Sequence, residues 1–143
     1  MTRPLLFTPI RLRAVELRNR LAISPMCQYS ARDGLANDFH LVHLGKFAMG
    51  GAGLLFAEAI AVHERGRITH GDLGLWHDGQ IAPLERITDF IRQLGAVPAI
   101  QLAHAGRKAS MQRPWNGNGP LDERDIAAGE IPWPVVAPSA LPL

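Results

Sequence analysis

The strongest constraint on the fold of this chain is that short apolar runs alternate along it with amphipathic stretches. Apolar runs at 21–24, 53–62 and 97–102 predict three strands, and the amphipathic stretches between them predict two helices. The strands begin roughly 33 and 43 residues apart, which is the spacing of βα units in a parallel sheet. The sequence therefore predicts an α/β fold made of consecutive βα units.

Three strands are too few for a closed (βα)8 barrel, which needs about 250 residues. The chain has 143 residues and ends at 139–143 without a closing element. We therefore expect it to supply about the first three βα units of a TIM (βα)8 barrel. A complete three-stranded, doubly wound domain is the alternative.

Local signals place the ends of both predicted helices. Asn37 or Asp38 is suited to cap the first helix, and Gly50–Gly51 to end it. Pro83 is suited to the first turn of the second helix, and Gly95 can close that helix. These signals predict that each strand is followed by one helix of ordinary length.

Two further segments flank the βα units. Residues 10–18 alternate apolar and charged side chains on either side of Ala14, which predicts a hairpin with one wet face. Residues 111–143 are rich in Pro, Gly, Asn and Asp but contain Trp115 and Trp133. We expect this tail to be an ordered excursion with contacts of its own.

Composition excludes several classes of partner. The formal net charge is +2 and no run of about five or six like charges occurs, so we expect no nucleic-acid partner. No stretch approaches about eighteen apolar residues, so we expect no membrane span. Residues 1–9 contain no long apolar segment, so we expect no signal peptide. The single cysteine fits a reducing compartment, and we expect a cytoplasmic protein.

Reactive side chains follow the first predicted strand. The segment Ser24–Tyr29 brings a hydroxyl, the only thiol, Cys27, and the only phenol to a strand end, where α/β proteins usually place their chemistry. A cysteine nucleophile needs a base that lowers its pKa. His40, His43 and His104 are candidates, so a hydrolase or transferase that uses Cys27 is one hypothesis.

Two other strand ends carry weaker signals. Gln101 ends an apolar strand, and a buried amide there has a donor and an acceptor to satisfy. It matches the edge of a flavin pyrimidine or a base, or it bonds to neighbouring loop backbone. Ala59 leaves room for a flat ligand to approach the second strand. His40 and His43 lack a third ligand, so we expect no metal site.

Together these motifs resemble the old yellow enzyme family of FMN-dependent ene-reductases, over essentially the whole chain. Cysteine at position 27, where other members carry threonine, is similar to the xenobiotic-reductase and thermophilic-like subgroup. The motifs are Leu6-Phe7-Thr8-Pro9, Leu17-Arg18-Asn19-Arg20, Ser24-Pro25-Met26-Cys27-Gln28-Tyr29-Ser30, Gly51-Ala52-Gly53-Leu54-Leu55, Glu58-Ala59, Gly66-Arg67-Ile68-Thr69 and Gln101-Leu102-Ala103-His104-Ala105-Gly106-Arg107-Lys108-Ala109-Ser110.

The resemblance implies that residues 1–143 are the N-terminal part of one FMN-binding TIM-barrel domain. The hairpin 10–18 would close the bottom of the barrel, and 111–143 would be a lid after the third strand. The implied reaction is ping-pong: NADPH or NADH reduces FMN, which then reduces the activated C=C bond of an α,β-unsaturated carbonyl compound. Family members are often dimers or tetramers, so we expect a homo-oligomer.

The resemblance also implies roles for single residues. The implied flavin contacts are Ser24, Pro25, Met26, Cys27, Ala59 and Gln101. Cys27 would tune the flavin near N5 and O4 without acting as a covalent nucleophile. Ala59 would offer its backbone N–H to flavin O4, and Gln101 would pair with the N1/O2/N3 edge. Tyr29 would face the substrate.

The remaining functional parts of the family would lie beyond Leu143. They are the substrate-anchoring histidine pair, the proton donor and the phosphate-binding loops. We therefore expect residues 1–143 alone to be inactive, and the rest of the barrel to come from the same chain or a second one. A non-catalytic half-barrel that needs a second chain is a further hypothesis.

Overall fold

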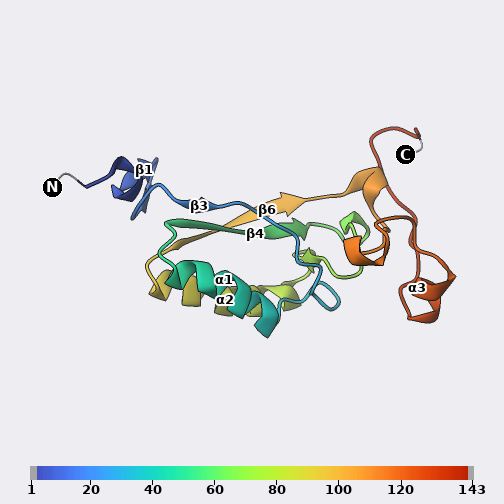
Figure 1. Cartoon of the computed structure of the whole chain (residues 1–143). Helices are drawn as coiled ribbons and strands as arrows, with labels where there is room; N and C mark the ends of the chain where they lie inside the picture. The colour runs from blue at the N-terminus through green and yellow to red at the C-terminus, as the bar shows by residue number, and fades with distance from the viewer. Residues whose placement is uncertain (1–2, 142–143) are drawn as a thin grey trace.

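The computed structural model describes residues 3–141, and its elements follow the predicted alternation of strands and helices (Figure 1). The strands are β1 (Ile10–Leu12), β2 (Val15–Leu17), β3 (Ala22–Ile23), β4 (Leu54–Ala61), β5 (Leu73–Gly74) and β6 (Val97–Ala103). The helices are α1 (Asp38–Met49), α2 (Ile81–Gln93) and α3 (Glu123–Ala127). Short 3-10 turns cover Leu5–Phe7, Glu64–Gly66, Asp78–Gln80, Gly106–Lys108 and Pro114–Asn116. The ends of the predicted domain 1–143, residues 1, 2, 142 and 143, lie outside the described residues.

Strand β4 is the centre of a parallel sheet. β6 pairs with β4 from its first residue to its last, with a β-bulge between Phe56 and Ala59. β3 pairs with the start of β4 and β5 with its end, so these two short strands share the other edge. The predicted parallel α/β arrangement is confirmed.

The predicted helix ends are also confirmed. Asn37 is the N-cap of α1, and its side-chain oxygen accepts the backbone N–H of Phe39 at 3.0 Å. Gly50 is the C-cap of that helix. Pro83 lies in the first turn of α2, and Gly95 follows this helix with a φ of +75°. Glycine adopts this left-handed conformation without the steric cost of a Cβ.

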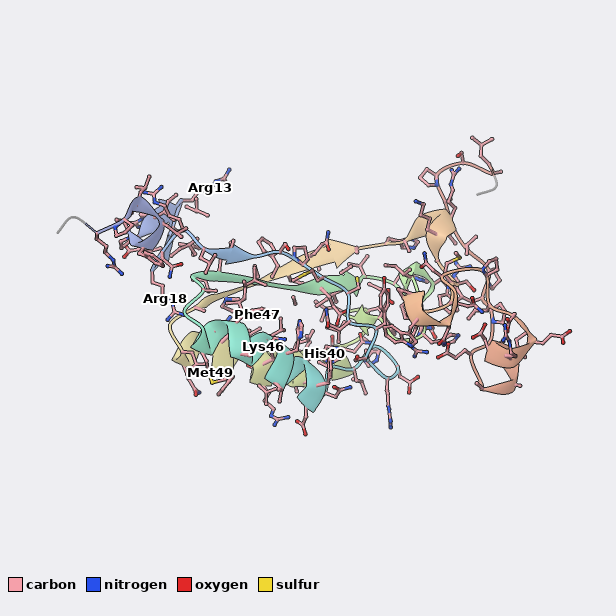
Figure 2. The ribbon with its side chains drawn as sticks, viewed as in Figure 1. Arg13, Arg18, His40, Lys46, Phe47 and Met49 are labelled. Atoms are coloured by element: carbon pink, nitrogen blue, oxygen red, sulfur yellow. The ribbon has the colours of Figure 1, made fainter. Side chains whose placement is uncertain are left out.

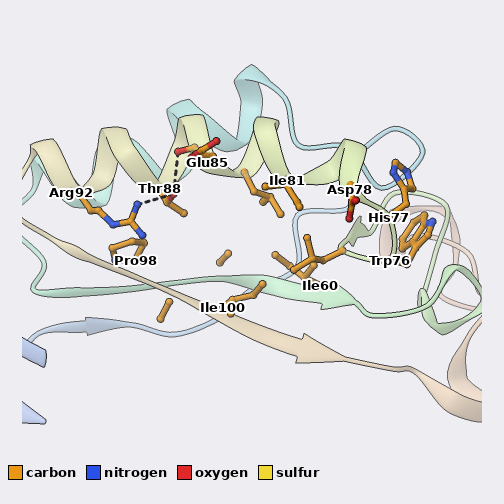
Figure 3. Close-up of a pocket in the computed structure, with 14 residues that line it drawn as sticks. Ile60, Trp76, His77, Asp78, Ile81, Glu85, Thr88, Arg92, Pro98 and Ile100 are labelled. Carbon is orange, nitrogen blue, oxygen red and sulfur yellow. Dashed lines mark hydrogen bonds between the residues drawn. The ribbon is translucent and has the colours of Figure 1, made fainter. Parts of the chain in front are cut away.

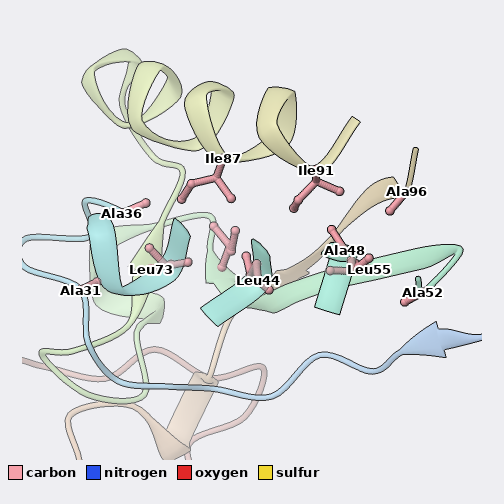
Figure 4. Packing of buried hydrophobic residues seen from close by; sticks show 11 residues of the cluster. Ala31, Ala36, Leu44, Ala48, Ala52, Leu55, Leu73, Ile87, Ile91 and Ala96 are labelled. Carbon is pink, nitrogen blue, oxygen red and sulfur yellow. The ribbon is translucent and has the colours of Figure 1, made fainter. Parts of the chain in front are cut away.

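The core lies between the sheet and the two long helices. α1 and α2 lie side by side on one face of the sheet (Figure 1). Leu44 from α1 and Ile87 and Ile91 from α2 pack against Leu55 and Ile60 of β4 (Figure 4). Each of these side chains is almost fully buried, and burying one stabilises the fold by about 1.5–3 kcal/mol.

The predicted hairpin is formed by β1 and β2, which pair antiparallel around a turn at Arg13 and Ala14. Arg18, directly after β2, joins the hairpin to the rest of the molecule (Figure 2). Its guanidinium donates to three carbonyl oxygens near the ends of α1 and α2, those of Ala48, Ala52 and Leu94. A cation is favourable where the carbonyls of a helix C-terminus are unpaired.

Three details of the predicted strands were wrong. The segment 21–24 was expected to be a buried strand, but only Ala22–Ile23 pairs, on one edge within the described residues, and Ala22 is exposed. The third strand does not end at 102 but at Ala103. Gln101 is exposed rather than buried. Ile60 faces the helices, so Ala59 and the in-register Gln101 face away from them.

Candidate functional site

Three of the predicted site residues meet where the parallel strands end. Cys27 lies four residues after β3, Ala59 lies in β4, and Gln101 lies in β6. The backbone N–H of Ala59 acts to lower the pKa of Cys27, which places it beside the thiol, and Ala59 pairs in register with Gln101. Ala59 therefore lies between the thiol of Cys27 and the strand position of Gln101.

The carboxamide of Gln101 is open on this face of the sheet. The side chain is exposed and makes no hydrogen bond with any described residue. Bonding to neighbouring loop backbone, the alternative for this residue, therefore does not occur among residues 3–141. Both the donor and the acceptor of Gln101 are free for a ligand.

The thiol of Cys27 lies beside the phenol of Tyr29, and both groups are protonated at neutral pH. Burial raises the pKa of Cys27 above its usual value of 9.0, while the hydrogen bonds from Ala59 and Tyr29 act in the opposite direction. Burial also raises the pKa of Tyr29 to about 12, with a further contribution from the charge of an ionised Cys27. A protonated, half-buried thiol is a poor nucleophile.

The three histidines considered as a base for Cys27 have other partners. Nε2 of His40 lies 3.1 Å from the carboxylate of Glu58. The ring of His43 stacks on that of Phe39, and burial lowers the pKa of this histidine. Nδ1 of His104 accepts the backbone N–H of Gly106 at 3.0 Å. This arrangement disfavours a hydrolase or transferase built on Cys27 and a histidine.

The residues between β3 and Cys27 form one side of the site. Ser24 and Met26 are exposed, and Pro25 is half-buried. The side chain of Gln28 donates to the carbonyl oxygen of Met26 at 2.8 Å, which keeps the loop tightly turned. Ser24 and Met26 are thus accessible to a ligand placed over the strand ends.

Two residues of the tail contact Tyr29, a partner that the sequence did not indicate for either of them. Nε of Arg113 donates to the carbonyl oxygen of Tyr29 at 3.2 Å. The ring of Trp115 contacts the tyrosine ring edge-on, with 5.9 Å between ring centres. The backbone of Tyr29 has a φ of +51°, which is unfavourable for an aromatic residue. No local sequence pattern predicts contacts between segments so far apart in the sequence.

A separate hollow lies on the other face of the sheet. A cleft of about 690 Å³ opens between α2 and strands β4 and β6 (Figure 3). Its lining is mostly apolar, with Ile60 and Ile100 on the strands and Ile81 on the helix, and Trp76 stands at one end. It contains none of the predicted site residues. The polar strand ends, rather than this cleft, are the candidate site.

Other kinds of site have no support among residues 3–141. No three His, Cys, Asp or Glu side chains in this part of the chain gather in a way that could hold a metal ion. No helix in the same residues combines the length and apolar character needed to cross a bilayer.

Comparison with known proteins identifies relatives along nearly the whole chain. A family model described as the NADH:flavin oxidoreductase / NADH oxidase family matches residues 5–137. An NADH:flavin oxidoreductase of Gibberella zeae is 52% identical over 138 residues, which are 94% of this chain and 32% of that protein. An NADPH dehydrogenase of Listeria monocytogenes is 46% identical over 139 residues, covering 96% of this chain and 35% of that protein.

A solved structure gives the same result for the fold. The old yellow enzyme of Trypanosoma cruzi matches with a TM-score of 0.73 and 27% identity, over 97% of this chain and 36% of that chain. The predicted TIM barrel, of which this chain supplies the N-terminal part, is confirmed. The chain spans about a third of the length of the curated relatives it matches.

Proposed function

Because this chain belongs to the NADH:flavin oxidoreductase / NADH oxidase family, we propose that the complete protein is an FMN-dependent ene-reductase. It takes hydride from NADPH or NADH and reduces the activated C=C bond of α,β-unsaturated carbonyl compounds. The observation that carries the proposal is the meeting of Cys27, Ala59 and Gln101 at the carboxyl ends of three parallel strands. TIM-barrel enzymes place their chemistry at this end of the barrel.

The described residues fit the polar rim of a flavin. The free donor and acceptor of Gln101 match the alternating N–H and C=O groups of the pyrimidine edge. Ala59 has no side chain beyond Cβ, so a flat ring can approach the sheet there. Ser24, Pro25 and Met26 would line the ring from the neighbouring loop.

The arrangement refines the roles proposed for Cys27 and Ala59. The backbone N–H of Ala59 and the phenol of Tyr29 both act to lower the pKa of Cys27, which places them beside its sulfur. The S–H of Cys27 would donate to a ligand. We propose that the thiol, backed by Ala59, provides the contact near flavin N5 and O4.

Bound FMN would supply the hydride chemistry, and the residues of this chain would bind and orient. Tyr29 keeps its proton at neutral pH because its pKa is about 12. Its single O–H, which lies beside the sulfur of Cys27, would donate to a substrate carbonyl when a substrate is bound. Trp115, which contacts the tyrosine ring, would form the wall of the substrate pocket on the tail side, and residues 111–143 would act as a lid.

The complete protein would need further parts. The substrate-anchoring histidines, the proton donor and the phosphate-binding loops would come from the rest of the barrel, on this chain or a second one. Residues 1–143 alone would be inactive. We also propose a homo-oligomer of the xenobiotic-reductase type, in the cytoplasm, where the free thiol of Cys27 would stay reduced.

The test uses the purified complete protein. It should carry a visible flavin absorbance that bleaches without oxygen on adding NADPH and returns on adding cyclohexenone. A colourless protein that takes up no added FMN would refute the proposal.

A second test separates the ene-reductase from a cysteine hydrolase. Cys27→Ala should leave a bound, reducible flavin, whereas a cysteine hydrolase would lose its activity. Intact mass and light scattering show whether the rest of the barrel is on the same chain and how many copies assemble.

A further inference from the structure

A buried pair of polar side chains lies behind the Cys27 loop, Glu58 from β4 and His40 from α1. Their exposed fractions are 4% and 2%. Oε1 of the carboxylate lies 3.1 Å from Nε2 of the imidazole. Apart from each other, these two atoms have no hydrogen-bonding partner among the described residues. The two side chains are closed to water, so each depends on the other.

The second carboxylate oxygen of Glu58 reaches the loop itself. Oε2 accepts the backbone N–H of Gln28 at 2.6 Å, which is a short, charge-assisted hydrogen bond. This N–H belongs to the peptide unit that joins Cys27 to Gln28. Its position therefore constrains the backbone of Cys27 and Gln28, directly before Tyr29.

The partner of Glu58 is anchored in turn by the start of α1. The backbone N–H of Asn37 donates to Nδ1 of His40 at 3.2 Å, which leaves Nε2 to face the carboxylate. The side chain of Asn37 also donates to the carbonyl oxygen of Ser30 at 2.8 Å. The helix start thus holds the far end of the loop directly and its centre through His40 and Glu58.

We propose that Glu58, anchored by His40, is a positioning residue that holds the thiol of Cys27 and the phenol of Tyr29 toward the flavin. The inference rests on the proposed function. A buried carboxylate–imidazole pair is weak grounds for a role in stability, because the cost of desolvating the two groups offsets their attraction. This carboxylate is distinguished by its reach: the side chain is long enough for one oxygen to contact His40 of α1 while the other accepts the N–H of Gln28 in the loop.

Two conservative variants separate the effect of the length of the Glu58 side chain from the effect of its charge. Glu58→Gln removes the charge but keeps the length of the side chain and an oxygen that can accept the N–H of Gln28. Its NH2 can donate to Nε2 of His40 in the imidazole tautomer in which Nδ1–H donates to Oδ1 of Asn37, 3.1 Å away. Glu58→Asp keeps the charge but is one methylene too short to span both partners. Asp125→Asn is a matched control, because it alters a buried carboxylate whose partners lie in the tail.

Two readouts are measured on the complete protein. Amide hydrogen exchange over residues 24–30 reports the bond to Gln28 without involving flavin. The dissociation constant for FMN reports the consequence for the site. In Glu58→Asp we expect exchange over 24–30 to rise and FMN binding to weaken, each about tenfold, with α2 unchanged. Glu58→Gln should stay within about threefold of the parent in both, and Asp125→Asn should match the parent.

Each other result overturns the inference. If Glu58→Asp matches the parent in both readouts, or if Glu58→Gln binds FMN more weakly than Glu58→Asp, the length of side chain 58 does not position the loop. If exchange rises equally across the whole chain, the role of Glu58 is general stability. If the loop loosens but FMN binding is unchanged, the loop does not position the flavin contacts.

If Glu58→Asp does not fold, a second variant takes its place. His40→Gln should then raise hydrogen exchange over residues 24–30, and an unchanged exchange rate refutes the proposal. Failure of the proposed function would show separately, as a parent protein that binds no FMN.

Discussion

Arg113 and Tyr29 are 84 positions apart in the sequence, yet Nε of the arginine donates to the carbonyl oxygen of the tyrosine at 3.2 Å. Arg113 is held in turn by an ion pair with Glu130, further along the same tail. Both charged side chains are mostly buried. The tail therefore supports the loop that carries the phenol, at a different residue from the one that Glu58 contacts.

We predict that Arg113→Ala lowers the free energy of unfolding by about 1–3 kcal/mol, because it leaves a carbonyl and a mostly buried carboxylate without their partner. Urea unfolding measures this loss. Arg86→Ala is the control, since Arg86 pairs with Asp38 on the exposed surface, where an ion pair contributes little. Equal losses in the two variants would contradict a supporting role for Arg113.

A second prediction concerns the close approach of Gly71 to Tyr29. A Cβ at position 71 would lie 2.2 Å from the carbonyl oxygen of Tyr29, whereas a Cβ at Gly119 would lie 3.6 Å from its nearest neighbour, Gln112. Gly71→Ala should therefore cost about 1–3 kcal/mol of stability through displacement of the loop. Gly119→Ala should cost less than about 0.5 kcal/mol. Thermal unfolding of the two variants side by side tests the difference, and a Gly71→Ala protein as stable as Gly119→Ala would disprove the clash.

These contacts mark the limit of what the sequence could predict. Helix caps such as Asn37 and Gly95 have local signatures, so their positions followed from the sequence. The grouping of Cys27 with Gln101 followed from the rule that the carboxyl ends of parallel strands meet at one edge. The contact of Arg113 with Tyr29 could not be predicted, because the tail has no periodicity from which to infer its path. The exposure of Gln101 was also missed, since an apolar strand does not reveal which of its faces is covered.

The raised pKa of Tyr29 predicts a pH dependence of stability. Its pKa is about 12 in the folded protein against an ordinary value of 10.0, so the folded state favours the protonated phenol. This contribution is fully present below pH 10 and is lost as the pH rises through about 12. Tyr29→Phe should remove this part of the alkaline destabilisation. Unfolding followed by circular dichroism across this range tests it, and identical curves for parent and variant would count against a buried phenol.

The tail has a second anchor in Arg67, which is 7% exposed. Its guanidinium lies 5.3 Å from the ring centre of Trp76 and 5.0 Å from that of Trp133. Arg67→Lys keeps the charge but loses the planar group that stacks on both rings. We predict about tenfold faster hydrogen exchange around Trp133 in this variant. Arg65→Lys, two residues earlier and exposed, should leave exchange unchanged, and equal effects would argue against the stacking.

The last prediction tests the flavin contact most directly. Gln101 is exposed, its amide is unengaged among the described residues, and it faces away from the helices. Gln101→Leu should therefore leave stability unchanged while weakening FMN binding about tenfold or more, because the bound flavin would lose the partners of its pyrimidine edge. Fluorescence titration of FMN into the complete flavin-free protein measures the dissociation constant.

Gln93→Leu provides the matched control, since Gln93 is an exposed glutamine on α2, on the opposite side of the sheet. The same substitution there changes surface chemistry equally but should leave FMN affinity at the parent value. If Gln101→Leu bound FMN as tightly as Gln93→Leu, the flavin would lie elsewhere than over Ala59. The in-register pairing of Ala59 with Gln101 would then be an ordinary feature of the sheet, since the two residues would no longer share a ligand.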